Sequence, residues 1–447
     1  MEMKLEENDA KEWEYRGEGA ANLVLSYTGS SPQFMGKVIR VQKVPRNGPK
    51  FERKGSVLSK QDLLLWEDAA FISSPNKEIA EQLYVQCVMK PLLGAEFVDP
   101  GICILVSRKF LELVERNVLC QRPLWRVDAA KVNIYADSVL LMSDHSVFPY
   151  SAIKGEPCIS VEIKPKCGFL PSSSFIPDKN AFKKNVTRFE MHQILKLKER
   201  KISQLSEYDP LDLFSGSKER IDKAIKALFA TPQNNFRVFL NGVLIYGELG
   251  EGGSNGTSFS KVEAFEDYIR PFMCSENGSS MASFVKLLRQ AIVELGVLDR
   301  LLEIQKLDKC DIEGAIHAYY DVVSQPCKVC GKTGEQNSLH SAPFDESQKI
   351  VKDFLLAATV KDCSLMISFR PMQKEDTESH YKTINLNSIG QRFECKACFI
   401  DLDLKLLKKM EYYYELDQKI VDCYRQMVKP GIGAAKDGTI EGYEAGY

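Results

Sequence analysis

Residues 14–27 read EYRGEGAANLVLSY and place a glycine-rich turn between two short, largely apolar strands. The turn itself is Gly17-Glu-Gly19-Ala20-Ala21-Asn22. Because glycine has no side chain, backbone amides at such a turn can approach a phosphate group closely. A strand on each side favours a small β-sheet that covers phosphates, whereas a Rossmann turn would open a helix. A tight hairpin without a ligand shows the same pattern and stays open as an alternative.

The next expected strand, residues 36–41, carries the cations Lys37 and Arg40. Protein kinases keep a cation for the nucleotide phosphates on the strand that follows their glycine-rich loop. Arg40 fits that position. Residues 37 and 40 face opposite sides of a strand, so the two cations cannot both serve one ligand.

The wider order of elements predicts two mixed units. Residues 149–158 (PYSAIKGEPC) carry two prolines and a glycine between apolar strands, which indicates a hinge. We expect residues 1–148 to form a small β-rich N-lobe and residues 159–429 a larger mixed C-lobe. Residues 430–447 have little apolar content and are expected to be disordered. The predicted fold class is α+β, two-lobed and distantly protein-kinase-like.

Periodicity and turn residues predict several individual elements. Helices are expected over about residues 76–90, ending before Pro91, and over about 107–117, 181–204 and 405–427. Strands are expected near 158–164, 363–369 and 398–403. Residues 234–246 should form a β-hairpin, because Asn241-Gly242 suits the type I′ turn.

The composition narrows the class of protein. The 447 residues include 59 Lys+Arg and 61 Asp+Glu, with a formal net charge of −2 and 44% hydrophobic residues. This balance is typical of a globular protein and argues against coating of nucleic acid or membrane, which favours a basic excess. The first residues lack the features of a secretory signal peptide. The 13 cysteines are expected to be reduced thiols. We expect a monomer in the cytoplasm, with residence in the nucleus left open.

Basic residues recur in segments that lie far apart in the sequence. In Glu162-Ile-Lys164-Pro-Lys166 the charged residues alternate and would share one face of a strand. Burial of that face would require anionic partners, whereas a solvated edge strand would not. Further cations and amides favour a small polyphosphorylated ligand as the shared partner: Arg126, Arg188, His192, Lys196, Asn234, Asn235, Arg237, Lys405, Lys408 and Lys409.

A second pattern concerns metal ligands. His317, Cys327, Cys330 and His340 are spaced as His-x9-Cys-x2-Cys-x9-His, which suits a tetrahedral structural Zn²⁺ site. Cys395 and Cys398 form another CxxC pair, but their segment is expected to be a strand that sends them to opposite faces. Ordinary reduced cysteines and surface histidines remain an alternative.

Two acids stand beside expected strands. Asp362 precedes the strand near 363–369, and Asp401 interrupts an apolar run at 399–405. An acid at the end of a buried strand is often a Mg²⁺ ligand or a base for an attacking hydroxyl. It is as often a cap or turn residue, and periodicity cannot decide between these roles.

Longer stretches resemble the inositol-pentakisphosphate 2-kinase family, and in particular its plant members, from about Trp13 to about Arg425. They are YRGEG at 15–19, QRPLWRV at 121–127, SVEIKPKCGFLP at 160–171, YDPLDLFSGS at 208–217, TPQNNFRVF at 231–239 and GVLDRLL at 296–302. The resemblance implies an ATP-dependent phosphotransferase with an alcohol acceptor. Its reaction would phosphorylate the axial 2-hydroxyl of inositol 1,3,4,5,6-pentakisphosphate and give inositol hexakisphosphate, phytic acid.

The resemblance also implies roles for matching residues. ATP would contact the loop at Gly17, Gly19, Ala20, Ala21 and Asn22, together with Arg40 and Glu162. Substrate phosphates would be bound by Arg126, Lys164, Lys166, His192, Lys196, Asn234, Asn235, Arg237, Lys405, Lys409 and Tyr413. Asp362 would act on the 2-hydroxyl, Lys164 would stabilise the transferred group and Asp401 would bind Mg²⁺. Plant members also hold zinc at positions matching His317, Cys327, Cys330 and His340.

Three positions depart from the family pattern. Ala20 stands where a further glycine is expected, Pro45 replaces an arginine that reaches substrate, and Lys409 replaces an arginine. Arg46 is a candidate substitute for the arginine missing at position 45. Lysine at 409 keeps the charge but loses bidentate geometry. A protein kinase is disfavoured because no His-Arg-Asp or Asp-Phe-Gly motif is present. A non-catalytic, zinc-stabilised scaffold that senses phytic acid is the alternative from another functional class.

Overall fold

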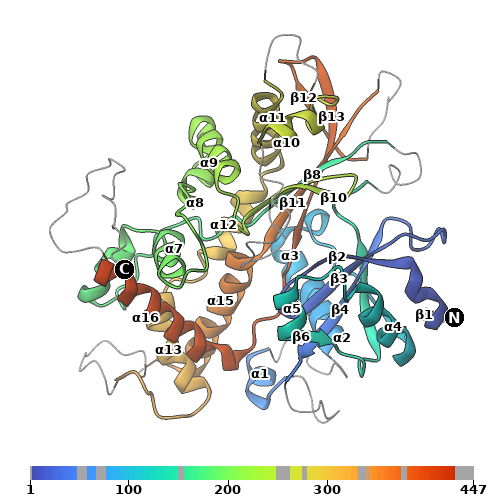
Figure 1. Ribbon diagram of the computed structural model, residues 1–447. Helices are drawn as coiled ribbons and strands as arrows, with labels where there is room; N and C mark the ends of the chain where they lie inside the picture. Colours follow the sequence, from blue (N-terminus) through green and yellow to red (C-terminus); the bar gives the residue numbers. More distant parts are fainter. Residues whose placement is uncertain are drawn as a thin grey trace, which may run out of the picture.

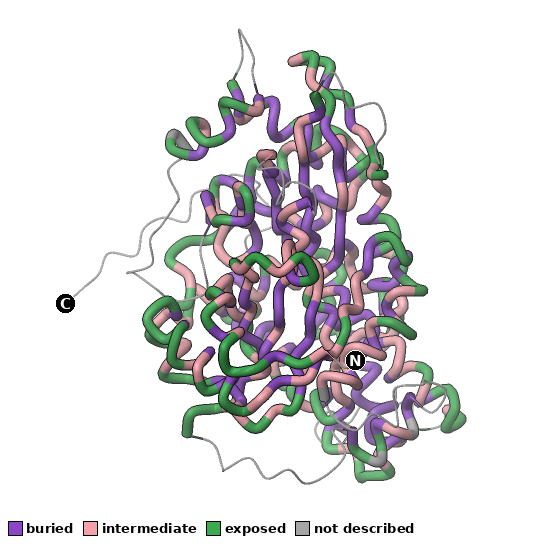
Figure 2. Tube along the Cα trace, turned by 90° about the vertical axis from the view of Figure 1, so that its right-hand side faces the viewer, coloured by how far each residue is buried: buried purple, intermediate pink, exposed green. Residues whose placement is uncertain are grey.

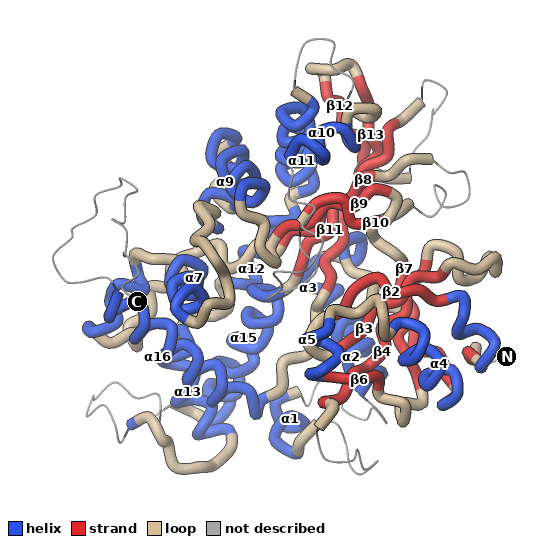
Figure 3. Tube along the Cα trace, in the orientation of Figure 1, coloured by secondary structure: helices blue, strands red, loops and turns tan. Residues whose placement is uncertain are grey.

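The computed structural model describes residues 3–47, 58–66, 77–148, 156–247, 262–273, 279–330, 340, 342–373 and 380–427. These residues form two β-sheets surrounded by helices, which confirms the mixed α and β class (Figures 1 and 3). Most of the expected hinge (149–155) and the expected disordered tail (430–447) lie outside the described residues. No helix in the described part of the chain is long and apolar enough to cross a bilayer.

The first sheet has seven strands in the order β1-β5-β7-β4-β3-β2, with β6 paired to β4. Its strands are β1 (Lys4–Leu5), β2 (Trp13–Glu18), β3 (Asn22–Tyr27), β4 (Lys37–Pro45), β5 (Ile102–Val106), β6 (Ala130–Val132) and β7 (Ser138–Ser143). The helical elements in this part of the chain are η1 (Glu7–Glu12), α1 (Lys60–Leu65), α2 (Lys77–Tyr84), η2 (Val85–Met89), α3 (Lys90–Leu93), η3 (Ala95–Phe97), α4 (Arg108–Val118) and α5 (Leu124–Ala129).

The second sheet has six strands in the order β10-β9-β8-β11-β13-β12. They are β8 (Ile159–Ile163), β9 (Phe236–Leu240), β10 (Val243–Tyr246), β11 (Ser364–Pro371), β12 (Lys382–Leu386) and β13 (Gln391–Ile400). Strands β9 and β10 form the expected hairpin, and both Asn241 (φ 49°) and Gly242 (φ 81°) have the positive φ that a type I′ turn requires.

Most helices belong to this second part of the chain. They are η4 (Asp178–Lys184), α7 (Arg188–Lys198), α8 (Pro210–Leu213), α9 (Lys218–Ala230), α10 (Val262–Ile269), α11 (Ser280–Leu295), α12 (Val297–Gln305), α13 (Asp311–Val322), α15 (Phe344–Asp362), η6 (Leu407–Lys409) and α16 (Met410–Met427). Figure 1 shows α13, α15 and α16 grouped on one side of the second sheet.

Two helix predictions were wrong in detail. The helix expected over 181–204 is split into η4 and α7, because Thr187 caps a new start and its side chain accepts a hydrogen bond from the Glu190 amide. The Thr-x-x-Glu spacing is a known start signal that would have located this boundary. Helical structure does not end before Pro91 either, since a π-turn over η2 leads into α3 with proline in its first turn.

Each sheet has its own hydrophobic core. Leu25, Ile39 and Phe110 are among the fully buried residues of the first core. The second core is larger and also includes Trp66 and Tyr84, although residues 58–98 precede the second sheet in sequence. Figure 2 shows the buried residues running through the middle of the molecule, with exposed residues around them. The helices before β5 therefore tie the two parts of the chain together.

The segment after β7 leads toward the second sheet and is fixed by side chains from three of its strands. Ser160 Oγ on β8 donates to the Ser146 carbonyl at 2.6 Å, and Ser368 Oγ on β11 donates to the His145 carbonyl at 2.6 Å. Lys396 on β13 donates to the Val147 carbonyl. Ser160, Ser368 and Lys396 are register partners on three adjacent strands, so residues 145–147 are held across one face of the second sheet.

A buried ion network joins the helices at the other end of the molecule. The Lys183 ammonium in η4 lies 2.6 Å from Asp311, 3.1 Å from Glu313 and 2.8 Å from Asp417. Arg188, at the start of α7, also binds Asp417. Burial, Asp417 and Asp308 raise the pKa of Asp311, and Lys183 opposes this rise, so the cation favours the charged form of this carboxylate.

We expect Lys183→Met to lower the free energy of unfolding by about 3–5 kcal/mol at pH 7, because it leaves several buried carboxylates with too little positive charge. Urea unfolding followed by circular dichroism measures this loss. The matched control is Lys349→Met, since Lys349 also pairs with an acid but its side chain is 72% exposed. A loss in the Lys183 variant no larger than in the control would contradict the role of this network.

Candidate functional site

The glycine-rich stretch forms the turn between β2 and β3. The Gly19 amide donates to the Asn22 carbonyl at 2.9 Å and closes the turn. A Cβ atom added to Gly17 or Gly19 would meet no atom of the described chain within 4 Å, and neither residue has a positive φ. The hairpin itself therefore does not require these glycines, and the open space on the loop is what an approaching ligand would need.

The loop is held in place by the buried carboxylate of Glu18, a residue for which the sequence predicted no role. The Glu18 side chain is only 1% exposed, and it accepts two hydrogen bonds from Arg122 at 2.9 and 3.0 Å and another from Lys43. Lys43 also donates to the Gly19 carbonyl at 2.7 Å. Burial opposes ionisation of Glu18, but Arg122 and Lys43 lower its pKa below the usual value. The loop thus has a fixed position relative to β4.

Arg40 lies on β4 directly beneath this loop. Its Nη2 donates to Asp403 Oδ1 at 2.7 Å. With the Asn22 amide oriented to satisfy both of its ends, Asn22 Oδ1 accepts from the same Nη2 at 2.8 Å. Lys37 instead donates to Ser143 at 3.2 Å. The structure therefore brings Arg40 and Asn22 together and gives Lys37 a different neighbour, as expected from the strand alternation.

Arg126 approaches the loop from α5. Its guanidinium stacks on Trp125 with 4.0 Å to the ring centroid, and its Nη1 donates to the Gly19 carbonyl at 3.3 Å. A pocket of about 260 Å³ opens here, lined by Ala20, Lys43, Val44, Pro45, Arg126, Ala129 and Ala130. The loop and this arginine thus share one recess.

Arg46 has other partners. It donates to the Val127 carbonyl at 2.6 Å, and its Nη2 lies 3.6 Å from Glu115. Because the protein itself binds this guanidinium, we do not expect Arg46 to replace the substrate-binding arginine that the family resemblance implies at position 45.

On the second sheet, β8 is not the solvated edge strand considered as an alternative. It lies between β9 and β11, and all five of its residues are buried. Glu162 accepts from Arg237 at 3.0 Å and from Ser364 at 2.9 Å. Burial opposes ionisation of Glu162, but Arg237 and Lys164 lower its pKa below the usual value. The charges of this strand therefore have the anionic and cationic partners that burial demands.

The expectation that Lys164 and Lys166 continue one strand face was wrong. The strand ends at Ile163, and Lys166 has a left-handed backbone with φ 62°. Pro165 cannot donate to a strand ladder, which accounts for the end of the pairing here. Lys164 nevertheless lies 3.5 Å from Asp401, and Lys166 lies 3.8 Å from Asp362. The two lysines reach neighbouring acids from different backbone conformations.

Asp362 is the last residue of α15 and the centre of a basic cluster. Its carboxylate is 3.5 Å from Lys405 and 3.8 Å from Lys166. The Asp362 side chain is 63% exposed, and these two lysines and then Lys164 outweigh its partial desolvation and lower its pKa. Burial and the nearby Asp362 carboxylate raise the pKa of Tyr413 on α16 to about 12. Residues from three separate segments therefore surround this carboxylate.

Asp401 follows the end of β13 and is not inside a strand, so the strand expected near 398–403 ends earlier than predicted. Its φ of 60° is unusual for a residue other than glycine. Burial would lower the pKa of Lys164, but Asp401 and then Glu162 raise it, which keeps that ammonium charged. A strained residue beside a fixed cation is an arrangement often found at functional sites.

Among the other predicted substrate residues, Asn235 contacts Lys164 of this cluster. The Asn235 carbonyl accepts from the Lys164 amide at 2.9 Å, and buried Asn235 Oδ1 has no partner within the described ranges. Asn234 is half-buried in the same turn, and His192 and Lys196 are half-buried on α7. Lys409 is exposed and lies 5.2 Å from the Tyr412 ring centroid. Arg188, by contrast, belongs to the Lys183 network.

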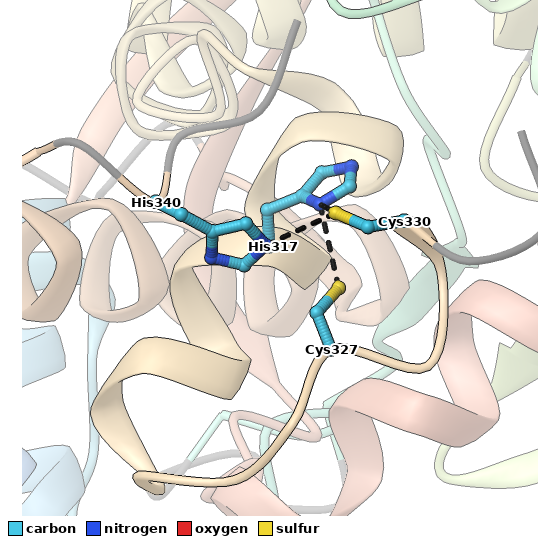
Figure 4. Close-up of side chains that lie close together, drawn as sticks. All are labelled: His317, Cys327, Cys330 and His340. Atoms are coloured by element: carbon cyan, nitrogen blue, oxygen red, sulfur yellow. Dashed lines mark hydrogen bonds between the residues drawn. The ribbon is translucent and has the colours of Figure 1, made fainter. Parts of the chain in front are cut away.

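His317, Cys327, Cys330 and His340 come together, as Figure 4 shows. The His317 Nδ1 atom is 3.5 Å from Cys327 Sγ and 3.4 Å from Cys330 Sγ, and Cys330 Sγ is 3.1 Å from His340 Nε2. A tetrahedral zinc ion would place sulfur and nitrogen ligands about 3.5 Å apart. His340 Nδ1 is 2.6 Å from Asp321 Oδ1, which leaves Nε2 directed at the cluster. Cys395 and Cys398 lie on β13 and join no such group in the described chain.

The comparison with known families decides the identity of the chain. A family model described as inositol-pentakisphosphate 2-kinase matches residues 15–419. The chain belongs to this family.

Relatives carry the same name across distant organisms. An inositol-pentakisphosphate 2-kinase of Arabidopsis thaliana is 55% identical over 447 residues, covering 98% of this chain and 99% of the relative. The protein named inositol-pentakisphosphate 2-kinase IPK1 in Oryza sativa subsp. japonica is 49% identical over 431 residues, covering 95% and 96%. A relative from Danio rerio is 29% identical over 492 residues, covering 94% and 95%. The family resemblance inferred from the sequence is thus confirmed along almost the whole chain.

In this member of the family, some features of the site had no clear signal in the sequence. Glu18 stands between two glycines, and only its burial against Arg122 and Lys43 gives it a role in holding the loop. Asp403 lies two residues beyond Asp401, and its contact with Arg40 joins residues 363 positions apart. Such long-range pairs follow from the packing of the two sheets rather than from local spacing.

Proposed function

We propose that this protein transfers the γ-phosphoryl group of ATP to the axial 2-hydroxyl of inositol 1,3,4,5,6-pentakisphosphate, which yields ADP and inositol hexakisphosphate. The observation that carries the proposal is the gathering of Lys164, Lys166 and Lys405 around Asp362, beside Asp401. Three ammonium groups that share two carboxylates leave positive charge for a ligand, which suits a small polyanion better than any neutral substrate.

The proposed acceptor site is the basic cluster around Asp362. Phosphates of the inositol would replace carboxylates as partners of Lys166 and Lys405, and Arg126, Asn234, Asn235, His192, Lys196, Lys409 and Tyr413 would bind further phosphates. Asp362 would then accept the proton of the 2-hydroxyl while the hydroxyl oxygen attacks the γ-phosphorus of ATP. Because lysines lower the pKa of Asp362, this carboxylate is a weak base. A loose transition state asks chiefly for orientation of the hydroxyl, so a weak base suffices.

The proposed donor site is the glycine-rich loop with Arg40. The amides of Ala20 and Ala21 and the Arg40 guanidinium would bind the nucleotide phosphates, while Gly17 and Gly19 leave room for them. Glu162 on β8 pairs with Arg237 on β9, and Lys164 follows two residues after Glu162. Lys164 would stabilise charge on the transferred group. Mg²⁺ bound by Asp401 would neutralise charge on the nucleotide phosphates. We further propose that the two sheets correspond to the lobes of a distantly protein-kinase-like fold.

The direct test is to incubate the purified protein with ATP, Mg²⁺ and inositol 1,3,4,5,6-pentakisphosphate, and to identify the product by phosphorus NMR. We expect ADP and inositol hexakisphosphate in equal amounts. A scaffold that only senses inositol phosphates would bind the pentakisphosphate and produce no ADP, which would overturn the proposal.

We expect Asp362→Asn to lower turnover by about 10³-fold, since a positioned base typically contributes 10²–10⁴-fold. Binding of the pentakisphosphate should be retained or become tighter, because the substitution removes a negative charge from among three lysines. Steady-state kinetics and isothermal titration calorimetry measure the two effects separately. Asp353→Asn is the matched control, because Asp353 lies on the same helix and pairs with Lys349 away from the cluster. Near-normal turnover in the Asp362 variant would exclude this carboxylate as the base.

We also propose that His317, Cys327, Cys330 and His340 bind one structural Zn²⁺. The fit of the sulfur–nitrogen distances to tetrahedral geometry supports this assignment, and so does the Asp321 carboxylate behind His340. Such an ion would join α13 to the segment that follows it.

We expect metal analysis to find one zinc ion per chain, and Cys330→Ser to lose it together with part of the thermal stability. Cys120→Ser is the matched control, because Cys120 is an exposed free cysteine outside the cluster. Zinc content should be read by plasma mass spectrometry and melting by calorimetry. Full zinc content in the Cys330 variant would count against this ligand set.

A further inference from the structure

The ion pair between Arg40 and Asp403 connects the two sheets. Arg40 lies on β4 of the first sheet, and Asp403 lies three residues after β13 of the second. Their Nη2 and Oδ1 atoms are 2.7 Å apart, and the side chains are 16% and 32% exposed. A pair this short and this sheltered from water holds its geometry better than an exposed salt bridge.

The same guanidinium is also held by the glycine-rich loop. Asn22 Oδ1 shares Nη2 with Asp403, and Asn22 Nδ2 donates to the Ala21 carbonyl at 3.3 Å. The Nε and Nη1 donors of Arg40 have no hydrogen-bond partner among the residues that the structure describes. Because a guanidinium is planar and rigid, fixing Nη2 on one side sets the direction of its other donors.

Electrostatics identify Asp403 as the dominant counter-ion. Burial alone would lower the pKa of Arg40, but Asp403 first, then Asp401 and Glu81, raise it above its ordinary value. Glu81 lies on α2, a helix placed before β5. Protein kinases use a glutamate on a helix of the nucleotide lobe to hold their phosphate-binding lysine. Here the closest acid comes instead from the other sheet.

We propose that Asp403 is a positioning residue for ATP. It holds the Arg40 guanidinium so that its remaining donors face the nucleotide phosphates, and it does so only when the second sheet is docked against the first. This inference rests on the proposed kinase function, since it concerns the nucleotide side of that site. It also makes the orientation of the nucleotide-binding cation depend on contact between the two halves of the chain.

The opposite expectation follows from charge alone. Removing a carboxylate near a triphosphate reduces repulsion and should strengthen ATP binding, whereas loss of positioning should weaken it. A third possibility is that Asp403 binds Mg²⁺ beside Asp401, in which case its removal would raise the Mg²⁺ requirement. Loss of positioning would weaken ATP binding, loss of repulsion would strengthen it, and loss of a Mg²⁺ ligand would raise the Mg²⁺ requirement.

The experiment compares Asp403→Asn and Asp403→Glu with the wild type. We expect Asp403→Asn to raise KM for ATP about tenfold with kcat changed less than twofold, the loss of one charge-assisted contact. Asp403→Glu should recover most of the affinity, and the Mg²⁺ concentration at half-maximal rate should stay the same. A lower or unchanged KM for ATP, or a raised Mg²⁺ requirement, would overturn the proposal.

Two controls separate positioning from general stability. Asp222→Asn breaks a comparable pair, in which Arg289 Nη1 lies 3.1 Å from Asp222 and both side chains are about as sheltered. It should leave the kinetics unchanged. In an Arg40→Met background, Asp403→Asn should cause no further loss, because its partner is already absent. A full additional loss there would show that Asp403 acts through another group.

Nucleotide binding alone distinguishes failure of this inference from failure of the proposed function. The dissociation constant of MgATP, measured by calorimetry without inositol phosphate, should rise about tenfold in Asp403→Asn even if the pentakisphosphate is not the acceptor. If the wild type is inactive but Asp403→Asn still weakens MgATP binding, only the proposed function is contradicted. If the wild type is active but Asp403→Asn binds MgATP normally, only the inference about Asp403 is contradicted.

Discussion

The central constraint on this molecule is that cations from distant segments must lie close together in a folded state without a ligand. Lys164, Lys166 and Lys405 converge although like charges repel, and the cost is limited by the carboxylates of Asp362 and Asp401. The acids are placed at the ends of a helix and a strand, where the backbone can present them to several lysines at once. Everything proposed for the acceptor site depends on this compensation.

The same compensation prepares the site for exchange of partners. A carboxylate that is 63% exposed, as in Asp362, is solvated well enough to release its lysines to a stronger anion. The deeper acids behave differently, since Glu18 and Glu162 are buried with two or more charged or hydroxyl partners each. Lysines paired with exposed acids can thus exchange them for a phosphate, whereas buried acids hold the loop and the central strand in place.

Local features of the fold could be predicted from the sequence, but long-range contacts could not. The Asn241-Gly242 hairpin follows from the backbone preferences of these two residues, both of which have a positive φ. The His–Cys cluster was predictable because its spacing limits the geometry of a metal site. In contrast, the alternation of Glu162, Lys164 and Lys166 suggested one strand face, and Pro165 ended the pairing instead. The partners of Glu18 and Arg40 depend on how the sheets pack, which no local pattern encodes.

The contacts between the sheets explain why the proposed donor and acceptor sites need not be built on one rigid element. Arg16, at an irregularity in β2 beside the glycine-rich loop, donates to Ser146 at 2.6 Å and packs over Phe239 of β9. An irregular residue of this kind redirects a side chain that regular pairing would place elsewhere. Together with the segment pinned by Ser160 and Ser368, it fixes the loop relative to the second sheet. Since phosphoryl transfer requires the two reactants in line, accuracy at this junction matters as much as the charges of either site.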